Sequence, residues 1–181
     1  MQKVLGRFLI VLYISILLFS GLIFFVKKSF PIKYSSQIEY ACERFSIPIT
    51  LGYSLINVES SFNKNAVSSA GAVGLTQILP NTANYICGKN GINYSSIDLK
   101  DANDNIIVGF MYLKYLLDKF EDKYTALSAY NAGETVVNSW LKNPEYCSDK
   151  ITLKIIPYKE TSNYIKKIKI NEKVYKYYYK K

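Results

Sequence analysis

Apolar and polar positions divide the chain into one long uncharged stretch and a series of shorter amphipathic segments. The uncharged stretch covers residues 8–26 and is bounded by Arg7 on one side and by Lys27 and Lys28 on the other. At about 1.5 Å per residue, a helix of this length just spans a hydrocarbon core of about 30 Å. The pattern therefore predicts a transmembrane helix, and we assign residues 1–34 to this anchor and its linker.

A cleaved secretory signal is the alternative interpretation of the same stretch. The apolar part of such a signal is usually about 7 to 15 residues long and precedes a cleavage site between small residues. Here Phe24, Phe25 and Val26 lead directly into lysines, which favours an uncleaved anchor. Because basic residues flank both ends of the stretch almost equally, the positive-inside rule predicts no orientation.

The rest of the chain shows the spacing of helices and no convincing strand pattern. Ser36 and Glu39 have the capping-box spacing, which predicts that a helix begins there. A second helix is predicted over residues 50–60, with Glu59 in its last turn. Apolar residues from 106 to 120 recur at steps of four and three, and Asp101 is a good N-cap for this long amphipathic helix. Further helices are predicted from Pro80 to near Gly88, up to Gly133, from Val136 to Leu141, and from about Lys159 onward.

Polar and glycine-rich segments separate these helices. Residues 62–74 are rich in Asn, Ser, Ala and Gly and lack a period, which indicates an ordered loop. From Ile165 onward lysine alternates with tyrosine and isoleucine, a pattern compatible with a basic helix or with a frayed end. We therefore predict a mainly α-helical domain over residues 35–170, followed by a basic tail over residues 171–181.

The formal charge of +9 comes from 23 Lys and Arg against 14 Asp and Glu, and lysines are dense in the last third of the chain. Such a surface favours polyanions, such as anionic lipid head groups, anionic wall polymers or nucleic acid. The membrane segment favours the first two, and no nucleic-acid motif is present, so no nucleic-acid partner is expected. A solvated basic surface without a partner explains the charge equally well.

Histidine is absent, and the cysteines are Cys42, Cys87 and Cys147. Without an imidazole, Ser-His and Cys-His hydrolase mechanisms and most zinc sites are excluded. The three cysteines contain no close pair of the metal-binding kind, and their odd number implies no disulfide framework. We expect no metal and no organic cofactor, so any chemistry depends on carboxylates, lysine, tyrosine or hydroxyls.

Glu59 is the candidate catalytic residue. Partial burial and the negative end of the helix dipole are both expected to raise its pKa. A carboxyl that keeps its proton near neutral pH can act as a general acid on a glycosidic oxygen. A single glutamate at a helix end is nevertheless more often a solvated surface charge, so the surrounding segments decide the interpretation.

Four segments occur in a recognisable order around this residue. They read Glu-Ser at 59–60, Gly-Ala-Val-Gly-Leu-Thr-Gln at 71–77, Ala-Tyr-Asn-Ala-Gly at 129–133 and Pro-Tyr-Lys-Glu-Thr-Ser-Asn-Tyr at 157–164. Together they resemble the catalytic domain of the soluble lytic transglycosylases over about residues 36–170. The resemblance implies a lysozyme-like, goose-type helical fold.

The same resemblance implies roles for individual residues. Glu59 would act as both the acid and the base, and the Tyr130 hydroxyl would lie near its carboxyl. The implied substrate-binding residues are Ser68, Gln77, Tyr130 and Asn131, and the implied supporting residues are Ser60 and Glu160. Gln77 can offer both a donor and an acceptor to the sugar. We expect Glu160 to support the cleft rather than to react.

Two positions depart from the family pattern. Lys64 stands where proline is usual, and Thr76 stands where the loop usually has methionine. Because a methionine would supply a long apolar contact to the sugar face, we expect Thr76 to change substrate affinity or subsite preference rather than the reaction.

The implied activity is that of a peptidoglycan lytic transglycosylase. Such an enzyme cleaves the β-1,4 bond between N-acetylmuramic acid and N-acetylglucosamine and leaves a 1,6-anhydromuramic acid end. Its expected partners are peptidoglycan glycan strands and the cytoplasmic membrane, which residues 8–26 would span once, with the catalytic domain outside and facing the cell wall. The alternatives are a goose-type lysozyme, which adds water to the same bond, and a peptidoglycan-binding module without activity. No oligomeric state is predicted.

Overall fold

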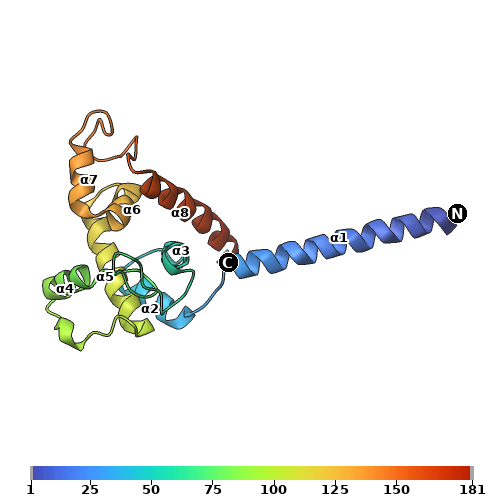
Figure 1. Cartoon of the computed structure of the whole chain (residues 1–181), viewed down its shortest axis with the longest axis horizontal. Helices are drawn as coiled ribbons and strands as arrows, with labels where there is room; N and C mark the ends of the chain where they lie inside the picture. The colour runs from blue at the N-terminus through green and yellow to red at the C-terminus, as the bar shows by residue number, and fades with distance from the viewer. Residues whose placement is uncertain (1, 180–181) are drawn as a thin grey trace. The chain divides into compact units, whose positions relative to one another are not determined.

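The structure, a computed structural model, describes residues 2–179, apart from the side chains of residues 2–5, 8 and 11 (Figure 1). It divides into two compact units, Met1–Pro31 and Ile32–Lys181. The end of the predicted basic tail, residues 180–181, lies outside the described residues. Residues 171–178 of that tail continue the last helix, so of the two structures expected for this segment the helix is found.

The first unit is a single apolar helix, α1 (Gln2–Ser29), with Lys27 and Lys28 in its last turn. Its apolar side chains are exposed along the length that is described; Leu18, for example, is 71% exposed. Among the described residues this is the one helix long and apolar enough to cross a membrane. A membrane span and a signal sequence are both long and apolar helices, so length and composition do not distinguish them.

The second unit is built of helices, and the predicted mainly α fold is confirmed. Its described residues contain only isolated β-bridges, from Val73 to Val67 and to Ile78. The helices are α2 (Ser35–Arg44), α3 (Ile49–Ser60), α4 (Pro80–Lys89), the short 3₁₀ helix η1 (Tyr94–Ser96), α5 (Ala102–Lys119), α6 (Lys123–Ala132), α7 (Glu134–Leu141) and α8 (Lys159–Tyr178).

Two predicted helix starts, near Ser36 and after Asp101, are both found, but only one of them has the predicted cap. Asp101 caps α5 as predicted, since its carboxylate accepts hydrogen bonds from the N–H groups of Asn103 and Asp104. The capping box predicted at Ser36 is wrong. Tyr34 precedes α2 in a left-handed conformation (φ 54°), and no side chain caps the helix. The N-terminus of α2 therefore follows a left-handed residue rather than a capping serine.

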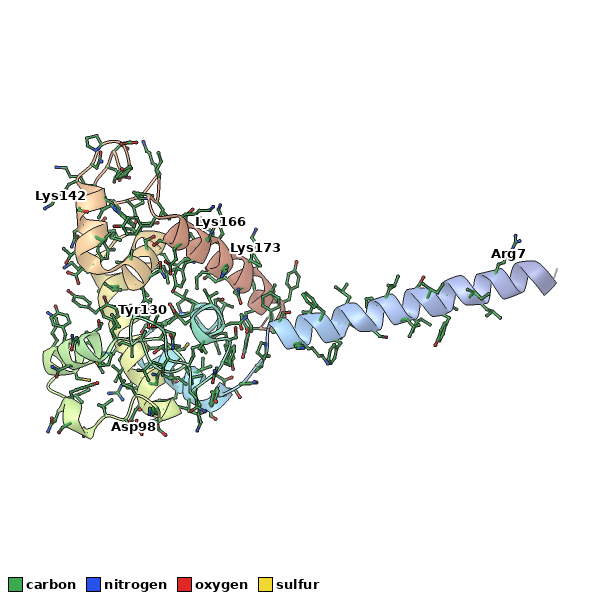
Figure 2. The ribbon with its side chains drawn as sticks, in the orientation of Figure 1. Arg7, Asp98, Tyr130, Lys142, Lys166 and Lys173 are labelled. Carbon is green, nitrogen blue, oxygen red and sulfur yellow. The ribbon has the colours of Figure 1, made fainter. Side chains whose placement is uncertain are left out.

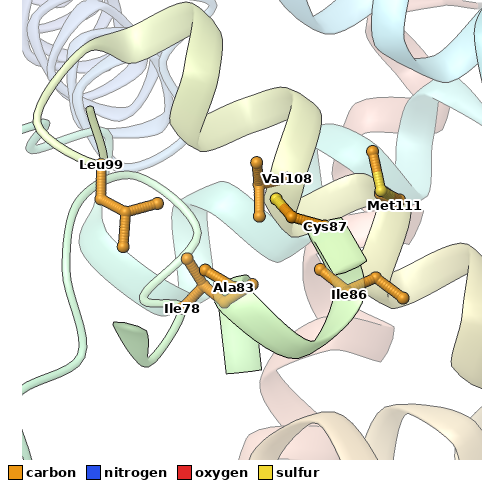
Figure 3. Close-up of a cluster of buried hydrophobic side chains, with 7 residues drawn as sticks. All are labelled: Ile78, Ala83, Ile86, Cys87, Leu99, Val108 and Met111. Carbon is orange, nitrogen blue, oxygen red and sulfur yellow. The ribbon is translucent and has the colours of Figure 1, made fainter. Parts of the chain in front are cut away.

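The long amphipathic helix α5 is the centre of the second unit and contacts α2, α4 and α6 (Figure 1). Its buried stripe includes Ile106, Phe110, Leu113 and Leu116. Figure 3 shows one part of this core, in which side chains of α4 meet those of α5. The buried residues of that cluster are Ile78, Ala83, Ile86, Cys87, Leu99, Val108 and Met111.

Cys42, Cys87 and Cys147 are all buried and unpaired. Burial raises the pKa of Cys42 to about 12, with a smaller contribution from the charge of Glu39. Burial also raises the pKa of Cys87. Because the thiolate is the reactive form, Cys42 and Cys87 are inert members of the core.

Asn105 clamps the 71–77 loop to α5. Its Oδ1 accepts hydrogen bonds from the N–H (2.9 Å) and the hydroxyl (2.8 Å) of Thr76. Its Nδ2 donates to the carbonyl oxygens of Val73 (2.9 Å) and Leu99 (2.9 Å). The loop approaches so closely that a Cβ on Gly74 would lie 2.2 Å from Nδ2, which requires glycine there. The buried amide thus uses its hydrogen-bonding groups on the loop and on the Leu99 carbonyl.

We predict that Asn105→Leu destabilises the second unit by about 3 kcal/mol, because it leaves several buried backbone groups without partners. Chemical denaturation of the full-length chain in detergent, followed by circular dichroism, measures this loss. Asn103→Leu, at an exposed position of the same helix, is the matched control and should change stability by less than about 0.5 kcal/mol. Equal effects of the two substitutions would contradict the role of the clamp.

Candidate active site

A cleft of about 600 Å³ opens in the second unit among the end of α3, the 68–79 loop, the end of α6 and the first half of α8. Six of the predicted site residues line it together: Glu59, Ser68, Gln77, Tyr130, Asn131 and Glu160. Ser60 does not line the cleft. The other lining residues are Val58, Ala70, Ala72, Ile78, Leu79, Thr82, Tyr112, Ala132, Gly133, Asn163, Tyr164 and Lys167.

The position of Glu59 follows from the way α3 ends. Ser61 and Phe62, the residues after the helix, both have left-handed backbone conformations, with φ of 51° and 62°. Phe62 is buried, which holds this turn against the core. The Ser60 hydroxyl bridges the helix end to the loop, because it lies 3.2 Å from the Ile56 carbonyl and 2.8 Å from the Leu75 carbonyl. Glu59 therefore stands on a fixed junction between helix and loop.

The carboxyl of Glu59 is partly buried in the cleft wall. Desolvation by the surrounding side chains raises its pKa from 4.5 to about 7, and interaction with the Tyr164 hydroxyl acts in the opposite direction. At that pKa the protonated and ionised forms are both populated near neutral pH. Such a group can give up a proton and then take one back, as acid–base catalysis requires.

Two tyrosines beside Glu59 remain neutral. Burial, and then the charge of Glu59, raise the pKa values of Tyr130 and Tyr164 well above their ordinary range. The Tyr130 hydroxyl donates a hydrogen bond to the Thr76 carbonyl (2.8 Å). The buried Tyr164 hydroxyl has no hydrogen bond of ordinary geometry with another described residue. Both phenols can therefore act only as hydrogen-bond donors or acceptors, not as bases.

The loop residues Ser68 and Gln77 line the cleft and also form hydrogen bonds within the loop. The Ser68 hydroxyl accepts a hydrogen bond from the Ala72 N–H (3.0 Å). Gln77 has a left-handed backbone (φ 48°), and its amide nitrogen donates to the carbonyls of Ala66 (3.1 Å) and Gly74 (2.9 Å). In this structure the loop uses the donors of the Gln77 amide, and the contact of Gln77 with a sugar stays a prediction.

Thr76 does not occupy the position expected for it. The side chain is fully buried, points to Asn105 and packs against Gly109, where an added Cβ would lie 2.3 Å from the Thr76 hydroxyl oxygen. An apolar contact of residue 76 with a sugar face is thus excluded in this structure. Lys64, the other departure from the family pattern, is exposed and does not line the cleft.

Asn131 and Glu160 approach the cleft from two helix ends. Asn131 lies in the last turn of α6, just before Gly133, whose positive φ of 93° lets the chain turn directly into α7. Glu160 lies in the first turn of α8 and is exposed. Glu59 and Glu160 are the two acidic residues that line the cleft. In the described part of the chain, no three His, Cys, Asp or Glu side chains are arranged to hold a metal ion.

Sequence reasoning missed several lining residues of α8. Asn163, Tyr164 and Lys167 follow Glu160 at steps of three, four and seven, which is the spacing of one helix face. That spacing could have revealed them once Glu160 was suspected. Tyr112 of α5 was also missed, because no motif in the neighbouring sequence marks it. Its ring centroid lies 5.4 Å from that of Tyr130.

Residues 36–152 match the family described as "Transglycosylase SLT domain". The chain belongs to this family. The predicted family and fold class are therefore confirmed, although the resemblance had been expected to extend to about residue 170. The match covers α2 through α7, and α8 lies beyond it.

Individual relatives agree with the family match. The chain is 31% identical to the soluble lytic murein transglycosylase of Escherichia coli, covering 84% of this chain and 24% of that protein. It is 35% identical to the membrane-bound lytic murein transglycosylase C of Haemophilus influenzae, covering 58% of this chain and 32% of that protein. The chain thus spans only about a quarter to a third of the length of these relatives.

The fold is similar to that of a solved relative. The structure of an inactive mutant of the lytic transglycosylase Slt from Pseudomonas aeruginosa, in which a glutamate is replaced by glutamine, matches with a TM-score of 0.72. The two are 26% identical, and the match covers 82% of this chain and 25% of that chain. The SLT fold therefore supplies the framework of the second unit.

The raised pKa of Glu59 predicts a pH-dependent stability. Because the folded carboxyl binds its proton more tightly than the unfolded one, stability falls as pH rises from about 4.5 to about 7. Glu59→Gln removes this titration, so the variant should gain stability relative to the wild type across that window and keep the gain above it. Denaturation midpoints measured from pH 4 to pH 8 test this, with Glu160→Gln as the control for loss of one cleft carboxylate. Parallel profiles of wild type and Glu59→Gln would refute the burial of this carboxyl.

Proposed function

We propose that the chain is a peptidoglycan lytic transglycosylase that cleaves the β-1,4 bond between N-acetylmuramic acid and N-acetylglucosamine. The observation that carries the proposal is the Glu59 carboxyl, desolvated to a pKa of about 7 in the wall of a cleft formed by the family's motifs. The names of the relatives, each a lytic murein transglycosylase, support the substrate class.

The first step is protonation of the leaving group. Glu59 gives its proton to the bridging oxygen, and the bond from that oxygen to the anomeric carbon of N-acetylmuramic acid breaks. The 2-acetamido group of the same sugar stabilises the positive anomeric carbon, in place of the second carboxylate that most glycosidases use. The Tyr164 hydroxyl, which remains neutral, faces the newly formed carboxylate and stabilises its charge.

The second step closes a ring. The ionised Glu59 takes the proton of the 6-hydroxyl of N-acetylmuramic acid, and the oxygen of that hydroxyl bonds to the anomeric carbon. The product carries a 1,6-anhydro end, Glu59 regains its proton, and no water is consumed. The attacking hydroxyl belongs to the same sugar, so it has the high effective concentration of a tethered nucleophile.

The remaining predicted residues take binding and supporting roles in this proposal. Ser68, Asn131 and the amide oxygen of Gln77 contact the sugar hydroxyl and acetamido groups. Tyr130 holds the loop through the Thr76 carbonyl while lining the cleft. The supporting residues are Ser60, which ties α3 to the loop, and Glu160, which lies at the cleft wall.

We further propose that the enzyme is anchored in the cytoplasmic membrane. Residues 8–26 span it once, residues 1–34 form the anchor and linker, and the catalytic domain over residues 35–170 faces the wall, because peptidoglycan lies outside the membrane. The exposed apolar side chains of α1 and a relative described as membrane-bound support this assignment.

Glu59→Gln should lower the rate of glycan cleavage by about a thousandfold or more, because the amide keeps the shape of the side chain but has no proton to give. Glu160→Gln should retain activity within about tenfold of the wild type, since Glu160 is assigned no proton transfer. Digestion of purified peptidoglycan by the detergent-solubilised chains measures both, with circular dichroism to establish that each variant folds. Wild-type activity in Glu59→Gln would end this proposal.

Hydrolysis of the same bond is the second candidate, and Glu160 is the observation that favours it, as a second carboxylate in the cleft that could activate water. We expect mass spectrometry of the products to show anhydro ends, lighter by one water than hydrolysed ends. Digestion in water labelled with heavy oxygen should leave these ends unlabelled. If the wild type instead produces reducing ends that contain heavy oxygen, and Glu160→Gln does not produce them, the enzyme is a lysozyme.

A further inference from the structure

Helix α8 presents three different sides. One side packs against α3 and α6. A second side lines the cleft through four residues that include Glu160 and Lys167. The third side is exposed to solvent and carries Lys166, Ile170, Lys173 and Tyr177 at the spacing of a single helical stripe, which we call the outer stripe. Figure 2 shows Lys166 and Lys173 along the helix.

The outer stripe is both basic and apolar. Ile170 is 56% exposed and Tyr177 is 76% exposed. Lys166 and Lys173 form no ion pair with another described residue, and neither does Lys176, which flanks the stripe. A helix face that combines lysines with exposed aliphatic and aromatic side chains suits the boundary between lipid head groups and acyl chains.

The acidic residues of α8 do not neutralise this stripe. Glu160 lies on the cleft side, and Glu172 is paired with Lys123 of α6 at 2.9 Å. Lys169, on the same flank as Lys176, lies over the ring of Tyr124 at 4.1 Å. The stripe therefore keeps a net positive charge.

The C-terminal end of α8 meets the beginning of the second unit. The ring of Tyr53 lies 5.3 Å from that of Tyr175 and 5.4 Å from that of Tyr179. Burial and Tyr179 raise the pKa of Tyr53, and the nearby side chain of Ser35 lowers it. Ser35 is the first residue of α2. The basic end of α8 is thus next to the point at which the chain enters this unit.

The connection from α1 is short. Helix α1 ends at Ser29 and α2 begins at Ser35, so five residues separate them. Six Cα–Cα steps join Ser29 to Ser35, so at about 3.5 Å per step this connection reaches at most about 21 Å. If α1 spans the membrane as proposed, Ser35 stays within that distance of Ser29, the last residue of α1. The adjacent end of α8 is then held near the lipid surface.

We propose that the outer stripe of α8 binds anionic phospholipid head groups of the membrane in which α1 is anchored. The inference rests on the proposed membrane anchor and adds a second contact to it. Consecutive residues of a helix point about 100° apart, so Lys166 on the stripe and Lys167 in the cleft face nearly perpendicular directions. Docking of the stripe therefore directs the opening of the cleft along the membrane plane rather than away from it.

The test uses the full-length chain in vesicles. Ile170→Cys places one thiol in the middle of the stripe, and because the native cysteines are buried, a fluorescent thiol reagent labels this position selectively. The vesicles contain phosphatidylcholine alone or phosphatidylcholine with phosphatidylglycerol, each with brominated acyl chains as quencher. We expect strong quenching of the label in the anionic vesicles and little in the neutral ones. Equal quenching in both would overturn the proposal.

Matched charge variants test the lysines. Lys166→Gln, Lys173→Gln and Lys176→Gln together should reduce quenching in anionic vesicles to the level of neutral ones. Removal of the same number of exposed charges by Lys142→Gln, Lys150→Gln and Lys154→Gln should leave it unchanged. The same loss from both triple variants, or from neither, would contradict specific docking. A soluble poly(glycerol phosphate) is the competing ligand. If it changes the fluorescence of the label while anionic vesicles do not, the stripe binds a wall polymer and the lipid proposal is overturned.

Two further measurements separate this inference from the proposals on which it rests. Retention in vesicles after an alkaline carbonate wash reports insertion of α1, and release by the wash would overturn the anchor and the docking together. Peptidoglycan digestion in detergent reports Glu59 chemistry, and the stripe variants should retain wild-type rates there. If the chain stays inserted and active but its label is quenched equally in anionic and neutral vesicles, docking alone is contradicted.

Discussion

The chemistry proposed for this chain depends on keeping one carboxyl partly out of water, and the fold must supply the free energy for it. Burial of Glu59 opposes folding whenever the group is ionised, so its surroundings have to be fixed by other interactions. Thr76 is the point at which these meet, although its side chain never enters the cleft. Its N–H and hydroxyl bind Asn105, and its carbonyl accepts from Tyr130. Together with the Ser60 bridge to Leu75, these bonds join α3, the loop, α5 and α6.

The two neutral tyrosines give this arrangement a simple electrostatic character. With the pKa values of Tyr130 and Tyr164 raised well above their ordinary range, proton exchange at the cleft wall near neutral pH falls to Glu59. The phenols can orient or stabilise its charge without competing for its proton. A histidine in their place would itself titrate near neutral pH and complicate the proton balance of the site.

How far the sequence predicts the structure depends on the range of the interactions involved. The cap at Asp101 is local and was predicted correctly, and the family follows from motifs whose order is visible in the chain. The environment of Thr76 was not predictable, because its partner Asn105 is distant in sequence and the pair meets only when the loop packs on α5. The capping box at Ser36 is wrong, since the residue before α2 is Tyr34, in a left-handed conformation that the Ser-x-x-Glu spacing does not reveal. The roles of the cleft residues remain predictions.

The three buried cysteines have a consequence for where this domain can acquire its structure. None is cross-linked, and burial raises the pKa values of Cys42 and Cys87, so the reactive thiolate form is suppressed. Folding of the domain therefore needs no disulfide-forming machinery. The packing described here uses non-covalent contacts alone at these three side chains, so it is compatible with reducing as well as oxidising surroundings.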